Sequence, residues 1–155
     1  CILINKKGTP LYDAITYKCP DNPREMALLF TYPPIIDSIL NGNAICLVEK
    51  VHSMPKQGVK SMFNFGYNYG LWQGILSCIP IRYDLITPQK WMKHYGTMPK
   101  DKRERKNYIK AIAQRLYPEA YITLATSDAI LIAHQLMETH EEEHIIVTPA
   151  NMPSA

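Results

Sequence analysis

The sequence predicts an α/β fold in which helices flank a mixed β-sheet. Short apolar runs with the character of strands alternate with longer stretches of helical periodicity, an order typical of this class. The first two strand-like runs are separated only by a short turn, so we expect the sheet to begin with an antiparallel hairpin. With 155 residues, of which 46% are hydrophobic and 20% charged, the chain is long enough for one domain with a substantial core.

The N-terminal third predicts three strands and two short helices. The expected elements are, in order, two strands on either side of a turn at residues 6–9, a helix from about residue 24, a helix over residues 35–40 and a strand over residues 44–49. Pro33 and Pro34 must end the first helix, because the residue before a proline disfavours helical backbone angles. Asn41 and Gly42 favour a C-cap for the second helix.

A long helix is expected over residues 62–78, with Ser61 as its N-cap. Gly66, Gly70 and Gly74 recur at every fourth position of this helix. Each glycine costs about 1 kcal/mol relative to alanine in a helix interior, so the stripe needs a structural reason. We expect the stripe to let this helix lie tightly against the sheet.

The rest of the chain predicts one more strand and three helices. A strand over residues 79–87 is followed by a short helix that Thr87 and Pro88 start, by a basic amphipathic helix over residues 101–116 and by a last helix from about residue 126 to 139. The basic helix is expected to bury one face. That face carries Tyr108, Ile109, Ile112 and Leu116.

We expect one domain over residues 1–140 and an acidic, loosely ordered tail over residues 141–155. The chain opens on Cys1 rather than on methionine and enters a strand at once, so we expect the start of this strand to lie in a preceding segment. The four cysteines show no CxxC pair and no metal-ligand spacing, which favours reduced thiols in an intracellular protein. No apolar run approaches the roughly 18 residues that span a bilayer, so no membrane partner is expected.

Positive charge is concentrated in one stretch of the chain. The net charge is +3, but residues 90–115 carry nine lysines and arginines against two acids. A basic stretch on a mildly acidic body fits a site for a polyanion such as nucleic acid. A solvated helix face would explain the same charges, and the charge pattern alone leaves both interpretations open.

Two carboxylates stand beside strongly apolar sequence. Glu49 ends the apolar run at residues 44–48, and Asp128 begins the apolar stretch at residues 129–133. Two carboxylates held close together repel each other unless a cation lies between them, and Mg²⁺ prefers one or two carboxylates together with phosphate oxygens and water. The structural alternatives are a Glu49 that lies in water past the strand end and an Asp128 that only stabilises a helix N-terminus.

Five stretches resemble, in the same order, the motifs of RuvC-like Holliday junction resolvases, closest to their phage and organelle branch. They are LVEKV, MPKQGVKSMFNFGYNYGLWQGIL, LITPQKWMKHYG, KDKRERKNYIKAIAQRLYP and SDAILIA, which cover most of residues 44–134. The resemblance implies a ribonuclease H-like fold, a homodimer and cutting of opposing strands in four-way DNA junctions with Mg²⁺ or Mn²⁺. It also implies action inside a cell, in bacterial or host cytoplasm or in an organelle.

The resemblance assigns a catalytic, metal-binding role to Glu49, which matches the strand-end glutamate of the family, and to Asp128, which matches the acid heading the last helix. Two departures from the family pattern are present. The first catalytic aspartate of the family has no counterpart, and we expect it in the preceding segment. The acid that the family carries shortly before Asp128 is replaced by Thr123 to Ala125, which implies weaker metal binding or a missing segment.

Under this interpretation, the DNA-contacting candidates follow from their positions around the two carboxylates. Lysines and arginines would hold phosphates, and an aromatic or apolar side chain would wedge between bases at the junction centre. The expected residues are His52, Met54, Lys56 and Lys60 in the loop after Glu49, Phe63 and Phe65 in the following helix, and Lys90, Lys93, Lys100, Lys102, Arg103, Arg105 and Lys106 in the basic stretch. Trp72, Trp91 and His134 are expected to be structural.

The leading hypothesis is therefore a structure-selective DNA endonuclease that resolves four-way junctions by metal-assisted hydrolysis. The alternative is a protein of the same fold that binds branched DNA without cutting it, because both departures from the family pattern remove acids. A ribonuclease H-like nuclease that acts on RNA–DNA hybrids is a third hypothesis that the sequence leaves open.

Overall fold

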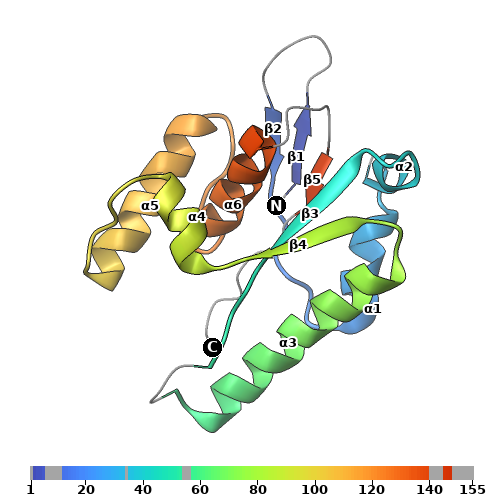
Figure 1. Cartoon of the computed structure of the whole chain (residues 1–155), viewed down its shortest axis with the longest axis horizontal. Coiled ribbons are helices and arrows are strands. Elements are labelled where there is room, and N and C mark those ends of the chain that lie inside the picture. Colours follow the sequence, from blue (N-terminus) through green and yellow to red (C-terminus); the bar gives the residue numbers. More distant parts are fainter. Residues whose placement is uncertain (1, 6–11, 34, 54–56, 140–144, 148–155) are drawn as a thin grey trace.

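Five strands form one sheet in the computed structural model of the chain, which describes residues 2–5, 12–33, 35–53, 57–139 and 145–147. The strands are β1 (Ile2–Asn5), β2 (Tyr12–Ile15), β3 (Ala44–Glu49), β4 (Arg82–Ile86) and β5 (Ile145–Val147), and their order across the sheet is β2-β1-β5-β3-β4 (Figure 1). β1 pairs antiparallel with β2 and β5, whereas β3 pairs parallel with β4 and β5. The mixed α/β class and the initial hairpin are confirmed, while the turn expected at residues 6–9 lies outside the described residues.

β5 corrects the expected domain organisation. Residues 141–155 were expected to form a loosely ordered tail, but Ile145–Val147 lies in the middle of the sheet, between β1 and β3. Both of its partner strands come from the N-terminal third of the chain, because Ile146 is paired with Leu3 on one side and with Ile45 on the other. Part of the segment beyond residue 140 therefore belongs to the folded domain.

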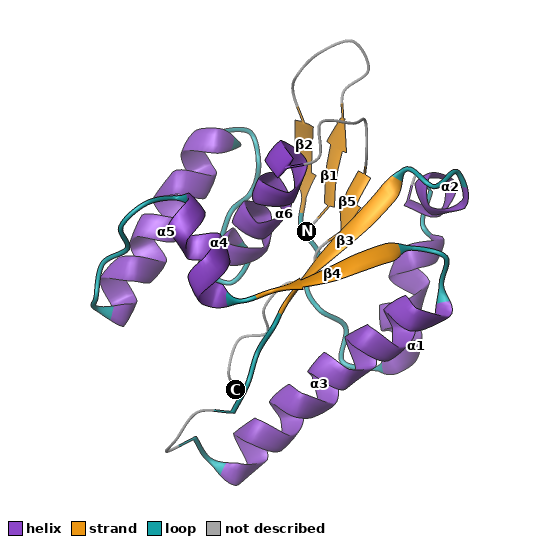
Figure 2. Ribbon diagram, viewed as in Figure 1, coloured by secondary structure: helices purple, strands orange, loops and turns teal. Residues whose placement is uncertain are grey.

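Two layers of helices cover the two faces of the sheet (Figure 2). The helices are α1 (Pro23–Leu28), α2 (Ile35–Leu40), α3 (Val59–Cys78), α4 (Pro88–His94), α5 (Lys102–Leu116) and α6 (Ser127–Thr139), with a short 3₁₀ turn, η1 (Leu29–Thr31), after α1. No helix in the described part of the chain combines the length and the apolar character that a membrane crossing needs.

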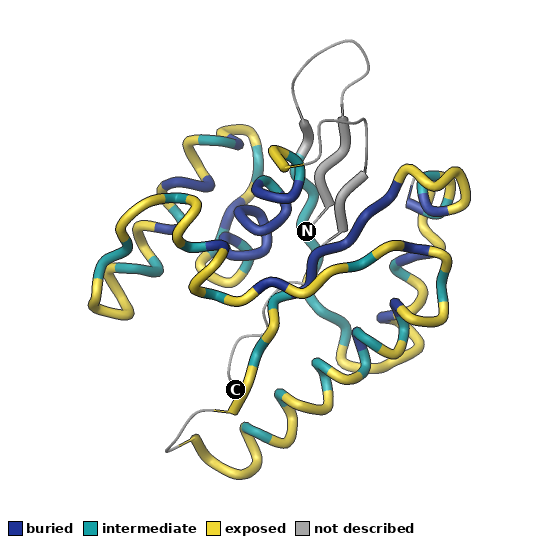
Figure 3. Tube along the Cα trace, viewed as in Figure 1, coloured by how far each residue is buried: buried dark blue, intermediate teal, exposed yellow. Residues whose placement is uncertain are grey.

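The strand β3 supplies core residues to both layers, because successive side chains of a strand point to opposite faces. Ile45 and Leu47 join the core that contains α4, α5 and α6. Ala44, Cys46 and Val48 join the core under α1, α2 and α3. The tube in Figure 3 is accordingly buried along β3 and most of α6, whereas much of α3 and the outer side of α5 is exposed.

Local hydrogen bonds explain most helix boundaries. Thr87 caps α4 as predicted, since its hydroxyl accepts a hydrogen bond from the backbone N–H of Lys90 at 3.3 Å, and Asp101 caps α5 in the same way. The prediction for Ser61 is wrong. α3 begins three residues earlier, at Val59, with Gly58 as its N-cap and no side-chain hydrogen bond there.

The predicted buried face of α5 is correct in its centre and wrong at one edge. Ile109 and Ile112 are buried together with Ala113, and Leu116 is partly buried. Tyr108 is 41% exposed. The buried stripe therefore follows the 109–112–113–116 positions, which lie on one side of a 3.6-residue helix, and Tyr108 falls at its border.

The glycine stripe of α3 does not lie against the sheet. Among the described residues, a Cβ atom built on Gly66, Gly70 or Gly74 would meet nothing within 4 Å, so no described backbone segment approaches these glycines closely. The stripe instead lines an open apolar groove of about 610 Å³ together with Tyr67, Leu71, Ile75 and neighbouring residues. The prediction that α3 packs tightly against the sheet of its own chain through its glycines is therefore wrong.

Candidate functional site

Glu49 lies at the carboxyl end of β3 and on the face covered by α4, α5 and α6. It shares its strand face with Ile45 and Leu47, because these positions are two residues apart along the strand. Its register partner on the neighbouring strand is Ile86, which belongs to the same core. The last residue of the apolar run therefore points toward this helical layer and not into open solvent.

The topology brings Asp128 to the same edge of the sheet. β5 runs parallel to β3 and begins where β3 begins, at the pair Ala44 and Ile145. α6 ends shortly before β5, and its 13 residues span about 20 Å, close to the length of the six-residue β3. Since α6 contacts β3, its first turn with Asp128 lies toward the carboxyl end of β3, where Glu49 lies (Figure 1).

The Glu49 carboxylate is held by a buried tryptophan. The indole N–H of Trp91 donates a hydrogen bond to Glu49 Oε1, with 2.7 Å between the two heavy atoms. Trp91 is on α4 and is only 1% exposed, so the donor has little freedom to move. Trp91 is a core residue, as predicted, and it also compensates the strand-end carboxylate, which the sequence did not reveal.

Asp128 is buried and pairs with a lysine. The Nζ atom of Lys106, on α5, donates to Asp128 Oδ2, and the two side chains are 36% and 7% exposed. Asp128 Oδ1 is buried without a hydrogen bond to any described residue. Lys106 was expected to contact phosphate; in this structure its ammonium group instead lies beside Asp128, where the sequence predicted a metal ion.

The donor set fits a hard divalent cation in part. Carboxylate oxygens are the ligands that Mg²⁺ prefers, and the unbonded Asp128 Oδ1 is a buried acceptor that a cation would satisfy. No group of three or more His, Cys, Asp or Glu side chains suited to a metal is present in the described ranges. Glu49 and Asp128 would therefore need oxygens from phosphate and water to complete the coordination of a metal ion.

Hydroxyl groups occupy the stretch in which the resemblance implied another acid. The Thr126 hydroxyl accepts a hydrogen bond from the backbone N–H of Thr123 at 3.0 Å, and the two threonine hydroxyls lie 3.1 Å apart. Ser127 N–H donates to the Thr123 carbonyl at 3.1 Å. This turn leads directly into α6 and places Asp128 in its first turn, so Thr123 has a structural role in the absence of a carboxylate.

The expected DNA-contacting residues fall into two groups on opposite faces of the sheet. Lys90 and Lys93 on α4, and Lys100, Lys102 and Arg103 at the start of α5, are exposed on the side of Glu49 and Asp128. The other group, Lys60, Phe63 and Phe65, lies on α3 in the opposite layer. Exposed His52 lies in the connection between the two layers, whereas Met54 and Lys56 lie outside the described residues.

Three of the expected DNA-contacting residues have surroundings that bear on their predicted roles. The Arg105 guanidinium donates to the carbonyls of Pro99 at 3.2 Å and Lys100 at 3.1 Å, so it holds the loop before α5 instead of being available as a free phosphate ligand. Phe63 is 73% exposed and stacks on Tyr67, while Phe65 is partly buried. Of the two phenylalanines, only Phe63 is positioned as an exposed aromatic surface.

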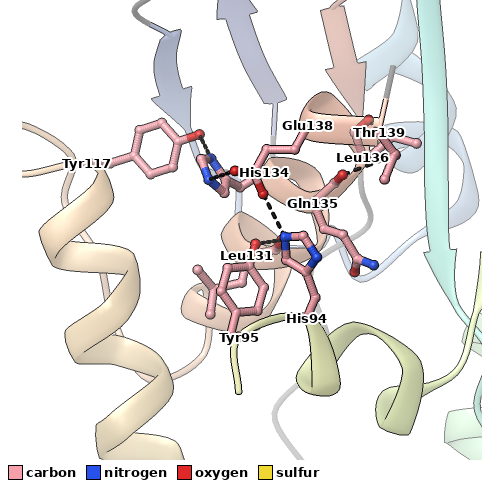
Figure 4. A network of polar contacts seen from close by, with 9 residues as sticks. All are labelled: His94, Tyr95, Tyr117, Leu131, His134, Gln135, Leu136, Glu138 and Thr139. Atoms are coloured by element: carbon pink, nitrogen blue, oxygen red, sulfur yellow. Dashed lines mark hydrogen bonds and ion pairs between the residues drawn. The ribbon is translucent and has the colours of Figure 1, made fainter. Parts of the chain in front are cut away.

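A polar network joins α4, α6 and the end of α5 (Figure 4). His94 Nε2 lies 2.6 Å from one oxygen of Glu138, and His134 Nε2 lies 3.5 Å from the other. The Tyr117 hydroxyl lies 2.8 Å from His134 Nδ1. Burial lowers the pKa of His134, and His94 acts in the same direction, against the opposing effect of Glu138.

The network gives His134 the structural role that was predicted for it, because its two ring nitrogens face Tyr117 and Glu138. Tyr95 extends the network by donating its hydroxyl to the Leu131 carbonyl at 2.6 Å, and burial raises the Tyr95 pKa above its usual range. These contacts fix α4 against α6.

Taken together, two carboxylates on rigid elements lie toward one edge of the sheet, next to a lysine and near an exposed basic surface on α4 and α5. This arrangement can bind a divalent cation together with an anionic oxygen ligand. Comparison of the sequence with protein-family models and with curated proteins gave no match.

Proposed function

We propose that the protein is a divalent-metal-dependent endonuclease that resolves four-way DNA junctions on a ribonuclease H-like fold. The observation that carries the proposal is that Glu49 and Asp128, from distant parts of the sequence, lie toward the same edge and on the same face of the sheet. The antiparallel strands at one side of the sheet and the parallel strands at the other, with helices on both faces, are compatible with this fold.

Glu49 and Asp128 would hold Mg²⁺ or Mn²⁺ in this proposal. Such an ion activates a water molecule for attack on phosphorus and stabilises the leaving oxygen in phosphodiester cleavage. The chain itself supplies the orientation, since Trp91 holds Glu49 Oε1 and the first turn of α6 holds Asp128. When a metal ion binds to Asp128, the Lys106 ammonium group would leave that carboxylate and bind a phosphate oxygen instead. Lys106 would then contact phosphate, as predicted.

The exposed lysines and arginine of α4 and α5 would bind the DNA backbone. Such contacts position a duplex and make affinity fall with salt, but they carry no base sequence. Selectivity for branched DNA would then come from the shape of the junction, with His52 and the residues after it near the point where strands cross. We therefore expect a steep salt dependence and little sequence preference in binding.

A homodimer is part of the proposal, since two cuts on opposing strands need two sites. The open groove along Gly66, Gly70 and Gly74 is the candidate contact surface, because small residues allow two helices to approach closely. Action inside a cell follows from the same proposed substrate.

The test compares cleavage of a synthetic four-way junction with cleavage of a linear duplex and of an RNA–DNA hybrid of the same sequence, in Mg²⁺. Paired, symmetric nicks confined to the junction are expected. Glu49→Gln and Asp128→Asn should each abolish cutting while junction binding is retained, because each removes one charged metal ligand and leaves the basic surface unchanged. Cutting that survives either substitution would refute the assignment, and cutting of the hybrid alone would point to a different nuclease.

A second function is favoured by two observations. Lys106 already provides a positive charge at Asp128, and a threonine turn occupies the place of the missing acid. Both features suit a protein that binds branched DNA without cutting it. Tight junction binding without nicks in Mg²⁺ would establish this function in place of the nuclease.

A further inference from the structure

We infer that Trp91 is a positioning residue for Glu49, an inference that rests on the proposed function because Glu49 acts there as a metal ligand. An indole N–H is a donor only, so the contact with Glu49 Oε1 at 2.7 Å has one possible direction. A donor that is fixed by packing restricts the carboxylate to the rotamers that keep the hydrogen bond. The side chain of Trp91 is 1% exposed and packs with Ile45, Leu47 and Ile86.

The backbone around this pair is also fixed. Glu49 and Ile86 are register partners at the ends of β3 and β4, and the N–H of Lys50 donates to the Ile86 carbonyl at 2.6 Å. Thr87 then caps α4 immediately after this pair, which brings Trp91 back toward the end of β3 within about one helical turn. The tryptophan and the carboxylate are therefore neighbours through a short and rigid path.

α4 also connects Glu49 to the element that carries Asp128. Tyr95 donates to the Leu131 carbonyl at 2.6 Å, and His94 bonds Glu138, so α4 is tied to α6 at two places (Figure 4). Trp91 thus fixes Glu49 relative to a helix that is itself fixed relative to Asp128. Loss of the indole N–H should loosen Glu49 without moving α4, because the remaining contacts of α4 do not depend on that hydrogen bond.

The chain offers a matched control in its other tryptophan. Trp72, on α3, is also buried, at 7% exposure, and makes an edge-to-face contact with Phe30. The Trp72 Nε1 atom has no partner among the described residues that meets the distance and angle of a hydrogen bond. The indole does lie near the Cys19 thiol and lowers its pKa, but burial raises that pKa by more. Exchange of either tryptophan for phenylalanine removes one indole N–H from a core, but only Trp91 donates to a proposed ligand.

The experiment measures Mn²⁺ binding to the full chain by the electron paramagnetic resonance signal of free Mn²⁺. Trp91→Phe should weaken binding by about 10- to 100-fold, the usual effect of removing a group that orients a ligand. Trp72→Phe should leave it unchanged. In junction cleavage, Trp91→Phe should raise the Mg²⁺ concentration for half-maximal rate, excess Mg²⁺ should restore part of the rate, and junction affinity should stay the same.

A second measurement keeps the inference testable if Trp91→Phe does not fold. In the Trp72→Phe background, Trp91 supplies the one indole N–H resonance of the chain in a ¹⁵N spectrum. Mg²⁺ should shift this resonance, and the additional change Glu49→Gln should abolish the shift.

The outcomes separate this inference from the proposed function. The positioning role is overturned if Trp91→Phe binds Mn²⁺ with wild-type affinity, or if Mg²⁺ does not shift the indole resonance. Either result counts against it even if the protein cuts junctions. Weakened Mn²⁺ binding in Trp91→Phe, in a protein that cuts no DNA, supports the positioning role and rejects the nuclease. An unmodified chain that binds no Mn²⁺, alone or with a junction, overturns both.

Discussion

The Lys106 ammonium group and a metal ion would compete for the same buried carboxylate. Lys106→Met leaves Asp128 without this partner, and an unpaired buried acceptor costs about 1–3 kcal/mol. We expect Lys106→Met to lower the free energy of unfolding by that amount without metal, and Mg²⁺ to recover part of the loss. Urea unfolding with and without Mg²⁺ measures both effects.

Lys102→Met is the control for this prediction, because Lys102 is exposed at the start of the same helix. Its substitution should change stability by less than about 0.5 kcal/mol and leave the Mg²⁺ effect as in the unmodified chain. Equal stabilisation of Lys106→Met and wild type by Mg²⁺ would show that Asp128 is not where the ion binds.

His134 should make stability depend on pH. Burial lowers its folded-state pKa, so the unfolded chain binds the proton more readily than the folded chain does. Stability should therefore be unaffected well above the ordinary histidine pKa of about 6.5 and should fall as the pH drops below it. His134→Gln should flatten the change in melting temperature between about pH 7.5 and 5.5, whereas His52→Gln, at an exposed position, should not. An unchanged slope in His134→Gln would assign the effect to other groups.

The candidate site could be predicted from the sequence only in part. Glu49 and Asp128 were recognisable because each interrupts or begins an apolar run at an element boundary. Their partners were not, since Trp91 is 42 positions from Glu49 and Lys106 is 22 positions from Asp128. A tryptophan in an apolar pattern and a lysine in a basic helix give no local signal of a specific partner, and only the tertiary arrangement selects one.

At the scale of elements, strong periodicity or clear boundary residues made prediction reliable. β3 and α2 were expected with the limits that the structure shows, because prolines, an Asn-Gly turn and a continuous apolar run define them. β5 was missed, since three residues after an acidic run carry too little pattern to indicate a strand. Its place in the sheet depends on pairing with β1 and β3, which is information that does not lie in the segment itself.

The glycines of α3 give a prediction about that helix. Alanine fits sterically at Gly66, Gly70 and Gly74, so Gly70→Ala should stabilise a single chain by about 1 kcal/mol through helix propensity. If two copies pack through this groove, the same methyl group should instead weaken the dimer. Thermal unfolding and sedimentation at several protein concentrations distinguish the two results, and the same readouts apply to Gly66→Ala and Gly74→Ala.

Gly42→Ala is the contrasting control. Gly42 ends α2 with a φ of 70°, a left-handed angle that costs a residue with a Cβ about 1–2 kcal/mol. This variant should lose stability at every protein concentration. A Gly70→Ala chain that behaves like Gly42→Ala, with a loss that does not depend on concentration, would contradict the open space seen around the α3 stripe.

At the scale of the whole molecule, β5 joins the two halves of the sheet. Ile146→Pro removes a backbone donor in a strand paired on both sides, and the loss of a ladder hydrogen bond leaves an unsatisfied acceptor at a cost of about 1–3 kcal/mol. We expect amide exchange in β1 and β2 to accelerate most, because their connection to the rest of the sheet runs through β5. Arg82→Pro, at the first residue of the edge strand β4, should cost much less. Equal protection of β1 in Ile146→Pro and wild type would contradict the central position of β5.

The position of β5 also has a consequence for biosynthesis. β1 and β2 are complete once synthesis has reached residue 15, yet β1 has to wait for residues 146 and 147 before it can join the sheet. During translation the N-terminal hairpin leaves the ribosome with one edge unpaired, while β3 and β4 can already assemble on their helices. Closure of the sheet is thus a late event that depends on a long sequence separation, which favours slow folding and a nascent chain that benefits from chaperone protection.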